Sequence, residues 1–257
     1  MLDIVTAHRS DVGRVRRLNE DSVLDGVRLW AVADGMGGHA AGDVASRIVI
    51  DNLRELDAHE GLRPADVVRR IHQANTAILA YGDANPEARG LGTTVTGVAL
   101  VTVGGADHWA VFNVGDSRVY RAVGAKLARA TIDHSETEEL VLEGLITPEQ
   151  ARTHRARNIV TRSLGMGGEV QVDLWVLPQT PGERFLVCSD GLNSELDDAA
   201  IEDILATHPE PAPAAAALVE AAVARGGRDN VTAIVVNVEG TLQADADVET
   251  NPHGRNE

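Results

Sequence analysis

Four aspartates stand at the borders of apolar runs, where their carboxylates could act together. Each run has the composition of a buried strand, and three of the four aspartates adjoin a Gly that lets the backbone turn sharply away. They are Asp34 after residues 29–33, Asp116 after residues 109–114, Asp190 after residues 184–189 and Asp229 before residues 231–238. The pattern predicts that the fold gathers carboxylates at one end of its sheets.

Carboxylates gathered in this way would need cations between them. Two carboxylates about 4 Å apart repel each other by roughly 4 kcal/mol at an effective dielectric constant of ~20. Oxygen ligands suit Mg²⁺ or Mn²⁺, and no His or Cys cluster has the spacing of a zinc site. Two such ions about 3.5–4 Å apart can orient a hydroxide for attack on phosphorus. The acidic pair Glu20-Asp21 is expected nearby, and Arg16 or Arg17 just before it could hold phosphate oxygens bidentately.

Asp beside Gly is also a common turn pair. For any one of the four aspartates, a simple turn is the better interpretation. Taken together they favour a cation site, because all four adjoin strongly apolar runs.

The charge of the chain bounds its partners. The 257 residues carry a formal net charge of −16, which argues against nucleic acid or an anionic membrane as a partner. Bound cations would invert that field locally for an enzyme acting on phosphates. The sequence contains no run of about 18 apolar residues, so it predicts no membrane span. The single cysteine, Cys188, lies in an apolar run and predicts an inert thiol in a reducing compartment, so we expect a cytoplasmic protein. We also expect a monomer.

Hydrophobic periodicity predicts the elements that position these residues. Apolar residues recur at helical spacing after residue 40, after Pro64, and in residues 197–206 and 214–225. Strands joined by tight turns fill residues 93–129 and must be antiparallel. The pattern therefore predicts an α+β fold of packed sheets with helices outside, in one domain.

Two segments differ from this body. Residues 131–172 are polar and predict two short helices, the second capped by Thr147 with Gln150 reaching back. This segment is either a mobile flap over a site or a plain surface loop. Residues 240–257 are polar, have nothing to bury, and predict a disordered acidic tail.

Six short motifs occur in an order and spacing that match a known family. They are Arg16-x-x-Asn19-Glu20-Asp21, Asp34-Gly35-Met36-Gly37-Gly38, Gly92-Thr93-Thr94, Gly115-Asp116-Ser117-Arg118, Ser189-Asp190-Gly191 and Arg228-Asp229-Asn230-Val231-Thr232. Over residues 3–238 the chain resembles the metal-dependent type 2C Ser/Thr protein phosphatases in their compact bacterial form. Each motif is weakly specific alone, but six in order are not expected by chance.

The resemblance implies a fold and a metal site. The fold would be a central β-sandwich of two antiparallel sheets flanked by helices, a catalytic domain over residues 1–239 with the flap at 131–172. Asp34 would bridge two Mg²⁺ or Mn²⁺ ions, and the Gly35 carbonyl would bind one of them. Asp190 and Asp229 would hold the other.

The resemblance also implies roles for the remaining site residues. Glu20 and Asp21 would act beside the ions, mainly through waters. Arg16 would grip the substrate phosphate, with Arg17 as a neighbouring surface charge. Asp116, together with Asp190, would hold a weaker third metal.

Two positions depart from the family pattern. Met36 stands where some members have a His proposed as the general acid, so that role has no occupant there. His39 is expected to open a helix rather than to catalyse. Ser194 stands where many members carry another Asp, which removes a ligand of the third metal unless Glu195 supplies one.

The implied reaction is hydrolysis of phosphoserine and phosphothreonine in proteins, opposing kinases, with Ser/Thr kinases among the substrates. Two alternatives stay open. One is a catalytically silent relative that binds phosphoproteins, although a binding module has no reason to keep costly clustered carboxylates. The other is the same chemistry on a different phosphoester target.

Overall fold

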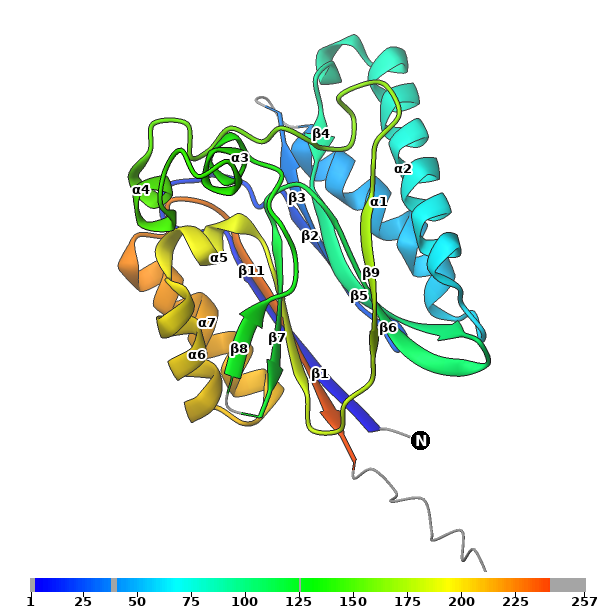
Figure 1. The fold of residues 1–257 in the computed structure, drawn as a ribbon. Coiled ribbons are helices and arrows are strands. Elements are labelled where there is room, and N and C mark those ends of the chain that lie inside the picture. Colours follow the sequence, from blue (N-terminus) through cyan, green and yellow to red (C-terminus); the bar gives the residue numbers. More distant parts are fainter. Residues whose placement is uncertain (1–2, 38–40, 125, 241–257) are drawn as a thin grey trace, which may run out of the picture.

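The computed structural model describes residues 3–37, 41–124 and 126–240 of the chain. Two antiparallel β-sheets lie face to face, and helices cover the outer face of each sheet (Figure 1). The α+β sandwich flanked by helices, predicted from the sequence, is confirmed.

The two sheets are built from strands far apart in the sequence. The first sheet has the order β1 (Asp3–Asp11), β11 (Val231–Glu239), β10 (Arg184–Cys188), β7 (Arg118–Val123) and β8 (Lys126–Arg129). The second has the order β2 (Asp21–Asp25), β3 (Leu29–Met36), β5 (Val95–Val103), β6 (Ala106–Val114) and β9 (Asp173–Pro178), with the short strand β4 (Gly92–Thr93) pairing with β3.

The helices fall into three groups. Two cover the second sheet, three cover the first, and a pair of short helices lies in the flap segment at one end of the sandwich (Figure 1). In that order they are α1 (Gly42–Asp57) and α2 (Pro64–Ala84), then α5 (Asp190–Glu195), α6 (Asp198–Thr207) and α7 (Pro211–Arg225), then α3 (Glu136–Leu142) and α4 (Pro148–Thr153), with a 3₁₀ turn at Pro86–Ala88. None of the helices within the described ranges is long and apolar enough to cross a membrane.

The apolar residues form three layers, one between the sheets and one under each group of covering helices. The few large aromatic residues concentrate between the sheets. There the ring of Trp109 lies 5.9 Å from that of Trp30 and 5.1 Å from that of Phe185, at tilted angles that favour aromatic contact. Because aromatic residues are scarce, Val, Ile, Leu and Ala fill the rest of these layers.

The register places the ends of the central strands at one end of the sandwich. Cys188, at the end of β10, pairs with Arg118 at the start of β7 and lies opposite Ala233 near the start of β11. In the second sheet, Asp34 near the end of β3 pairs with Asp21 at the start of β2. The chain segments that leave this end of the two sheets carry the predicted acidic residues.

Strand β3 is longer than its sequence predicts. The apolar run suggested a strand ending at residue 33, but β3 continues to Met36. The reason lies in a distant segment, because β4 pairs with Gly35 and Met36 and extends the ladder. Asp34 therefore sits inside a strand, where its direction is fixed by hydrogen bonds on both sides.

Candidate metal centre

Five predicted acidic residues meet at this end of the sandwich. Asp21 and Asp34 are direct cross-strand partners, a placement that is destabilising for like charges. Asp190 begins α5 immediately after β10, and Asp229 lies just before β11, the neighbour of β10 in the sheet. Asp116 lies in the turn between β6 and β7 and is buried. The structure thus brings together carboxylates from separate segments of the chain, as predicted.

The electrostatics of the group reflect this crowding. Removal from water, reinforced by the nearby charges of Asp190 and Asp229, raises the pKa of Asp21 to about 7. The same two causes raise the pKa of Asp190 to about 6, with Asp229 as the repelling neighbour. Desolvation and neighbouring carboxylates also hold the pKa values of Asp34 and Asp116 well above their usual range. Without a cation the centre would therefore keep protons that ordinary aspartates lose.

Asp21 shows that the centre fits a cation. Its Oδ2 atom accepts hydrogen bonds from Ser189 Oγ at 2.8 Å and Thr232 Oγ1 at 2.6 Å. Its Oδ1 atom is excluded from solvent and has no hydrogen-bond partner among the described residues. A buried carboxylate oxygen without a partner is costly, and a cation or the water it carries would satisfy it.

The backbone around Asp34 is tightly packed. A Cβ on Gly35 would lie 2.2 Å from the carbonyl oxygen of Gly42, so no larger residue fits where β3 meets the start of α1. The Gly35 N–H donates to the Glu20 carbonyl at 3.2 Å, and the Asp34 N–H donates to Thr94 Oγ1 at 3.1 Å. Desolvation raises the pKa of Glu20, whose carboxylate lies against Gly42. These contacts hold Gly35 and Glu20 beside the centre.

Arg16 reaches the centre from the loop before β2. Its Nη2 atom donates to Asp229 Oδ2 at 2.6 Å. Asn230 fixes this loop, because its Nδ2 donates to the carbonyls of Val12 and Leu18 while its Oδ1 accepts from the Glu20 N–H at 2.9 Å. The sequence placed Asn230 in a motif but indicated no role for it. Its role as the brace of the Arg16 loop emerges only from contacts more than 200 positions apart.

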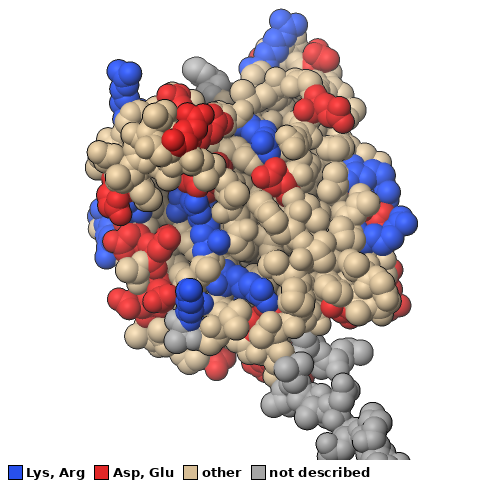
Figure 2. Space-filling model, viewed as in Figure 1, with Lys and Arg blue, Asp and Glu red and all other residues tan. Residues whose placement is uncertain are grey.

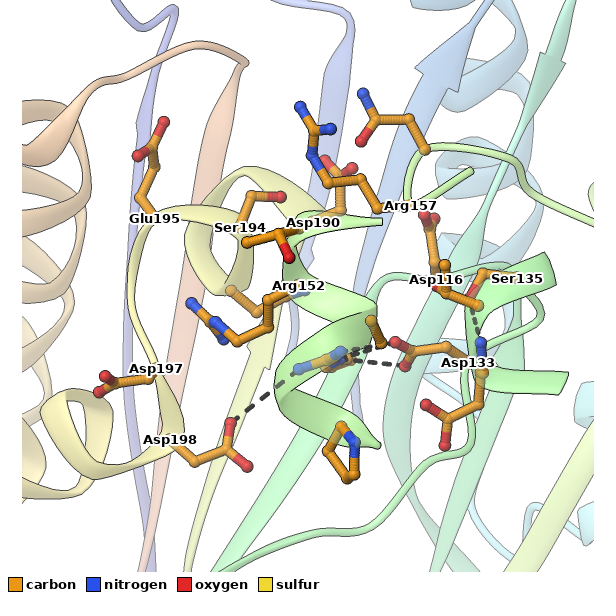
Figure 3. A pocket seen from close by; sticks show the side chains of 18 of the residues that line it. Asp116, Asp133, Ser135, Arg152, Arg157, Asp190, Ser194, Glu195, Asp197 and Asp198 are labelled. Carbon is orange, nitrogen blue, oxygen red and sulfur yellow. Dashed lines mark hydrogen bonds and ion pairs between the residues drawn. The ribbon is translucent and has the colours of Figure 1, made fainter. Parts of the chain in front are cut away.

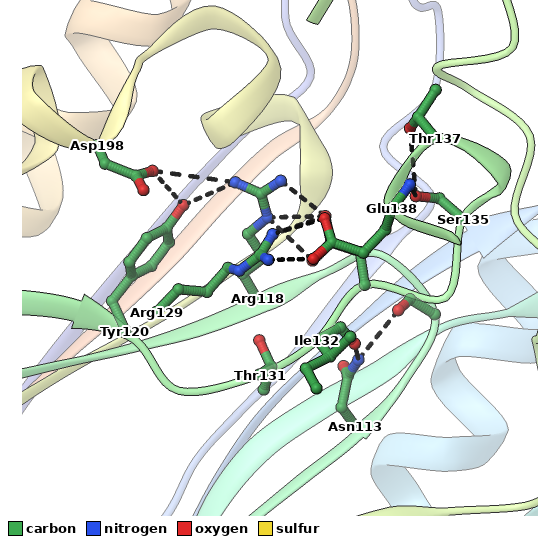
Figure 4. Close-up of polar contacts among 12 residues, drawn as sticks. Asn113, Arg118, Tyr120, Arg129, Thr131, Ile132, Ser135, Thr137, Glu138 and Asp198 are labelled. Carbon is green, nitrogen blue, oxygen red and sulfur yellow. Dashed lines mark hydrogen bonds and ion pairs between the residues drawn. The ribbon is translucent and has the colours of Figure 1, made fainter. Parts of the chain in front are cut away.

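A polar network next to the centre joins β7 to the flap. Arg118 forms an ion pair with Asp133, with Nε 3.0 Å from each carboxylate oxygen and Nη2 2.6 Å from Oδ2. Figure 4 shows the Arg118 guanidinium next to Tyr120 and Asp198. Its Nη1 donates to the hydroxyl of Tyr120, which in turn donates to Asp198 at 3.0 Å. Arg129 adds an ion pair to Glu138 of α3. The network ties β7, the start of α6 and the flap together.

The two departures from the family pattern have structural consequences. Met36 ends β3, and its thioether has no proton to give, while His39 lies outside the described residues. Glu195 accepts hydrogen bonds from Arg228 at 2.8 Å and 3.0 Å and lies away from Asp116 (Figure 3). It is therefore engaged elsewhere and does not replace the missing carboxylate at Ser194.

The carboxylates of the centre do not by themselves enclose a cation. In the part of the chain that the structure describes, no three acidic, His or Cys side chains converge tightly enough to hold one ion alone. Mg²⁺ and Mn²⁺ do not require such a cage, since Mg²⁺ in particular keeps several waters and binds through one or two carboxylates. The oxygen-only donor set with room for waters fits these ions.

Fold and site together define a helix-flanked β-sandwich protein with an oxygen-donor cation centre at one end. A family model described as protein phosphatase 2C matches residues 14–221. The Ser/Thr protein phosphatase PstP of Mycobacterium tuberculosis is 42% identical over 234 residues, which are 90% of this chain and 44% of that protein. The Ser/Thr phosphatase stp of Listeria monocytogenes is 35% identical over 242 residues, 89% of this chain and 93% of that protein. This chain belongs to the protein phosphatase 2C family.

Solved structures agree with this assignment. The catalytic domain of PstP in complex with two manganese ions superposes with a TM-score of 0.84 at 39% identity, covering 93% of this chain and 100% of that one. A second structure of the M. tuberculosis phosphatase gives a TM-score of 0.88 at 40% identity over the same shares. The chain spans less than half the length of the curated mycobacterial relatives that it matches.

Proposed function

We propose that this chain is a metal-dependent Ser/Thr protein phosphatase that hydrolyses phosphoserine and phosphothreonine and opposes protein kinases. The observation that carries the proposal is the meeting of Asp21, Asp34, Asp190 and Asp229 at one end of the sandwich, with pKa values of Asp21 and Asp190 raised by desolvation and mutual repulsion. The manganese complex of the related PstP domain supports it.

The acidic residues would hold two Mn²⁺ or Mg²⁺ ions. In this proposal Asp34, the Gly35 carbonyl, Asp190 and Asp229 would supply the protein oxygens that hold these ions. Ions held there would lower the pKa of a bound water and would neutralise charge that develops on the phosphoryl oxygens. Asp21 accepts hydrogen bonds from Ser189 and Thr232 through Oδ2, so its partnerless Oδ1 could accept one from a water carried by an ion.

Arg16 would bind the substrate phosphate. Its side chain is 48% exposed and makes a single ion pair, so further guanidinium N–H donors remain for phosphate oxygens. Glu20 would act beside it through waters. Asp116 with Asp190 would form a third, weaker metal site, because Ser194 offers a hydroxyl where a carboxylate would bind more strongly.

The wider assignment follows from the same reasoning. We propose that residues 1–239 form one catalytic domain, of which 131–172 are a flap beside the centre, and that residues 240–257 are a tail. Residues 241–257 of that tail lie outside the described ranges. The proposed substrates are phosphoproteins, Ser/Thr kinases among them, and the proposed form is a cytoplasmic monomer.

The test compares phosphopeptides that differ only in the phosphorylated residue. With Mn²⁺ present, the chain is expected to release phosphate from phosphothreonine and phosphoserine peptides faster than from the matched phosphotyrosine peptide, and to stop when a chelator removes the metal. Peptide binding without any phosphate release in Mn²⁺ or Mg²⁺ would instead identify a silent relative. Release that continues after chelation would refute the metal-dependent reaction.

A further inference from the structure

A pocket of about 1010 Å³ extends from the metal centre under the flap. Asp116, Asp190 and Asp229 are among the residues that line it. The flap faces α5 and the start of α6 across the pocket (Figure 3). A substrate with its phosphate at the centre would therefore place neighbouring residues in this pocket. None of the roles proposed above uses the flap wall.

Beyond the metal centre, most carboxylates that line the pocket already have a hydrogen-bond donor. Asp133, Glu138 and Glu195 form ion pairs with Arg118, Arg129 and Arg228; Asp197 caps α6 through the Ala200 N–H, and Asp198 accepts from the Tyr120 hydroxyl. Three of these carboxylates are therefore neutralised by arginines, and two others are held by neutral donors, while Glu149 is exposed in the first turn of α4.

Two pocket arginines are different. Arg152 at the end of α4 and Arg157 five residues later are exposed, and neither side chain makes a hydrogen bond or ion pair with any residue in the described ranges. Figure 3 shows both side chains reaching from the flap into the pocket. They leave two uncompensated positive charges facing the space next to the metal centre.

We propose that Arg152 and Arg157 bind a second anionic group of the substrate, a carboxylate or a further phosphate on a residue near the one being dephosphorylated. A guanidinium matches both groups bidentately. The inference rests on the proposed function, since the phosphorylated residue at the metal centre sets which neighbours reach the flap.

Because the whole molecule is negatively charged, a preference for an anionic substrate would depend on this pair of arginines. The chain carries a net charge of −16 and would repel an acidic peptide at long range. On the face in Figure 2, basic side chains form separate groups between acidic ones rather than one continuous field. Preference for an anionic substrate must then come from short-range contacts such as these two arginines, and it should weaken as salt is added.

The experiment measures selectivity within matched peptides. A phosphothreonine peptide with neutral flanks is compared with versions carrying Glu or phosphoserine at each flanking position in turn, and kcat/KM is determined with Mn²⁺ for the holoenzyme. We expect at least one anionic version to be preferred by about two- to thirtyfold, the range for two exposed ion pairs. A preference for phosphoserine alone would identify the second group as a phosphate, and a preference shared by Glu would identify it as any acidic residue.

The double variant Arg152→Gln/Arg157→Gln should bring this ratio close to one. Arg155→Gln is the matched control, because Arg155 is an exposed flap arginine that does not line the pocket. It should keep the wild-type ratio. A wild-type ratio of one at every position, or a ratio that survives in the double variant, would overturn the inference.

A binding arm separates this inference from the proposed function. Fluorescence anisotropy with the same labelled peptides reports the ratio of affinities without turnover. If no peptide is hydrolysed, the proposed function fails, while an anionic preference in binding that the double variant loses would still support the arginine pair. If both peptides are hydrolysed at equal rates and bound equally, the proposed function stands and the arginine pair is wrong.

Discussion

In the metal-free chain, the free energy of unfolding is expected to fall as the pH rises from about 5 to about 8. Desolvation raises the pKa of Asp21 to about 7, whereas an aspartate in an unfolded chain titrates near ~3.9. Between these values the folded, metal-free chain holds a proton that the unfolded chain has lost. Because the folded state binds more protons than the unfolded state, the free energy of unfolding falls as the pH rises. The fall extends from the unfolded pKa to the folded pKa and is complete above the folded pKa.

The size of the effect follows from this shift. Linkage for one carboxyl titrating at about 7 when folded and ~3.9 when unfolded gives a loss of roughly 2.5 kcal/mol between about pH 5 and pH 8. Asp190, whose pKa is about 6, acts in the same direction but shares its repulsion with Asp21, so the two losses do not add fully. For a domain of this size, 2.5 kcal/mol corresponds to a fall in Tm of about 5–10 °C.

The assay is thermal unfolding of chelator-treated protein at both pH values, repeated with Mn²⁺. His134 has the opposite effect, because desolvation lowers its pKa in the folded chain. Its contribution to the free energy of unfolding therefore rises as the pH rises and the imidazole becomes neutral. Asp21→Asn therefore serves as the internal comparison, since it removes one titration and leaves His134 in place. We expect the metal-free wild type to lose more Tm than Asp21→Asn, and Mn²⁺ to abolish the difference. Equal pH dependence of the two metal-free proteins would refute the reasoning.

Two substitutions test the positive side chains of the site. Arg16→Ala should lower kcat/KM for a phosphothreonine peptide by about 10- to 100-fold, the worth of a lost charge-assisted hydrogen bond. Arg17→Ala, a change at an exposed neighbour, should stay near wild type, and equal losses in both would contradict the role of Arg16. Arg118→Ala should lower the free energy of unfolding in urea by about 1.5–3 kcal/mol, because it removes the hydrogen bonds to the buried Asp133 carboxylate, which keeps only the longer ion pair with Arg129 at 3.5 Å. A loss below about 1 kcal/mol would show that the ion pair contributes little.

Local rules carried much of the sequence analysis. The second short helix of the flap begins where Thr147 and Gln150 were expected to cap it, and both reciprocal hydrogen bonds are present. The alternation of apolar runs and turns predicted antiparallel strands, and the position of each Asp at the border of an apolar run predicted the acidic group at one end of the sheets. These features depend on residues within a few positions of each other, so they can be predicted from the sequence before the fold is known.

Features that depend on distant partners were not predicted. The extension of β3 to Met36 requires β4, and the direct pairing of Asp21 with Asp34 requires the register of β2 on β3. The apolar run from Arg184 gave no sign of the helix α5 that follows it. The role of Asn230 arises from contacts across the length of the chain. No periodicity in the sequence records these pairings, because packing of the two sheets creates them.

The most direct test of the account is the stoichiometry of Mn²⁺ binding near neutral pH, measured by calorimetry on the full chain. The wild type is expected to bind about two ions, and Asp190→Asn should bind at least one fewer and lose turnover of a phosphothreonine peptide. Asp203→Asn, an exposed carboxylate on α6, is the control and should match the wild type in both measurements. Unchanged ion binding and turnover in Asp190→Asn would contradict a shared centre built from these aspartates.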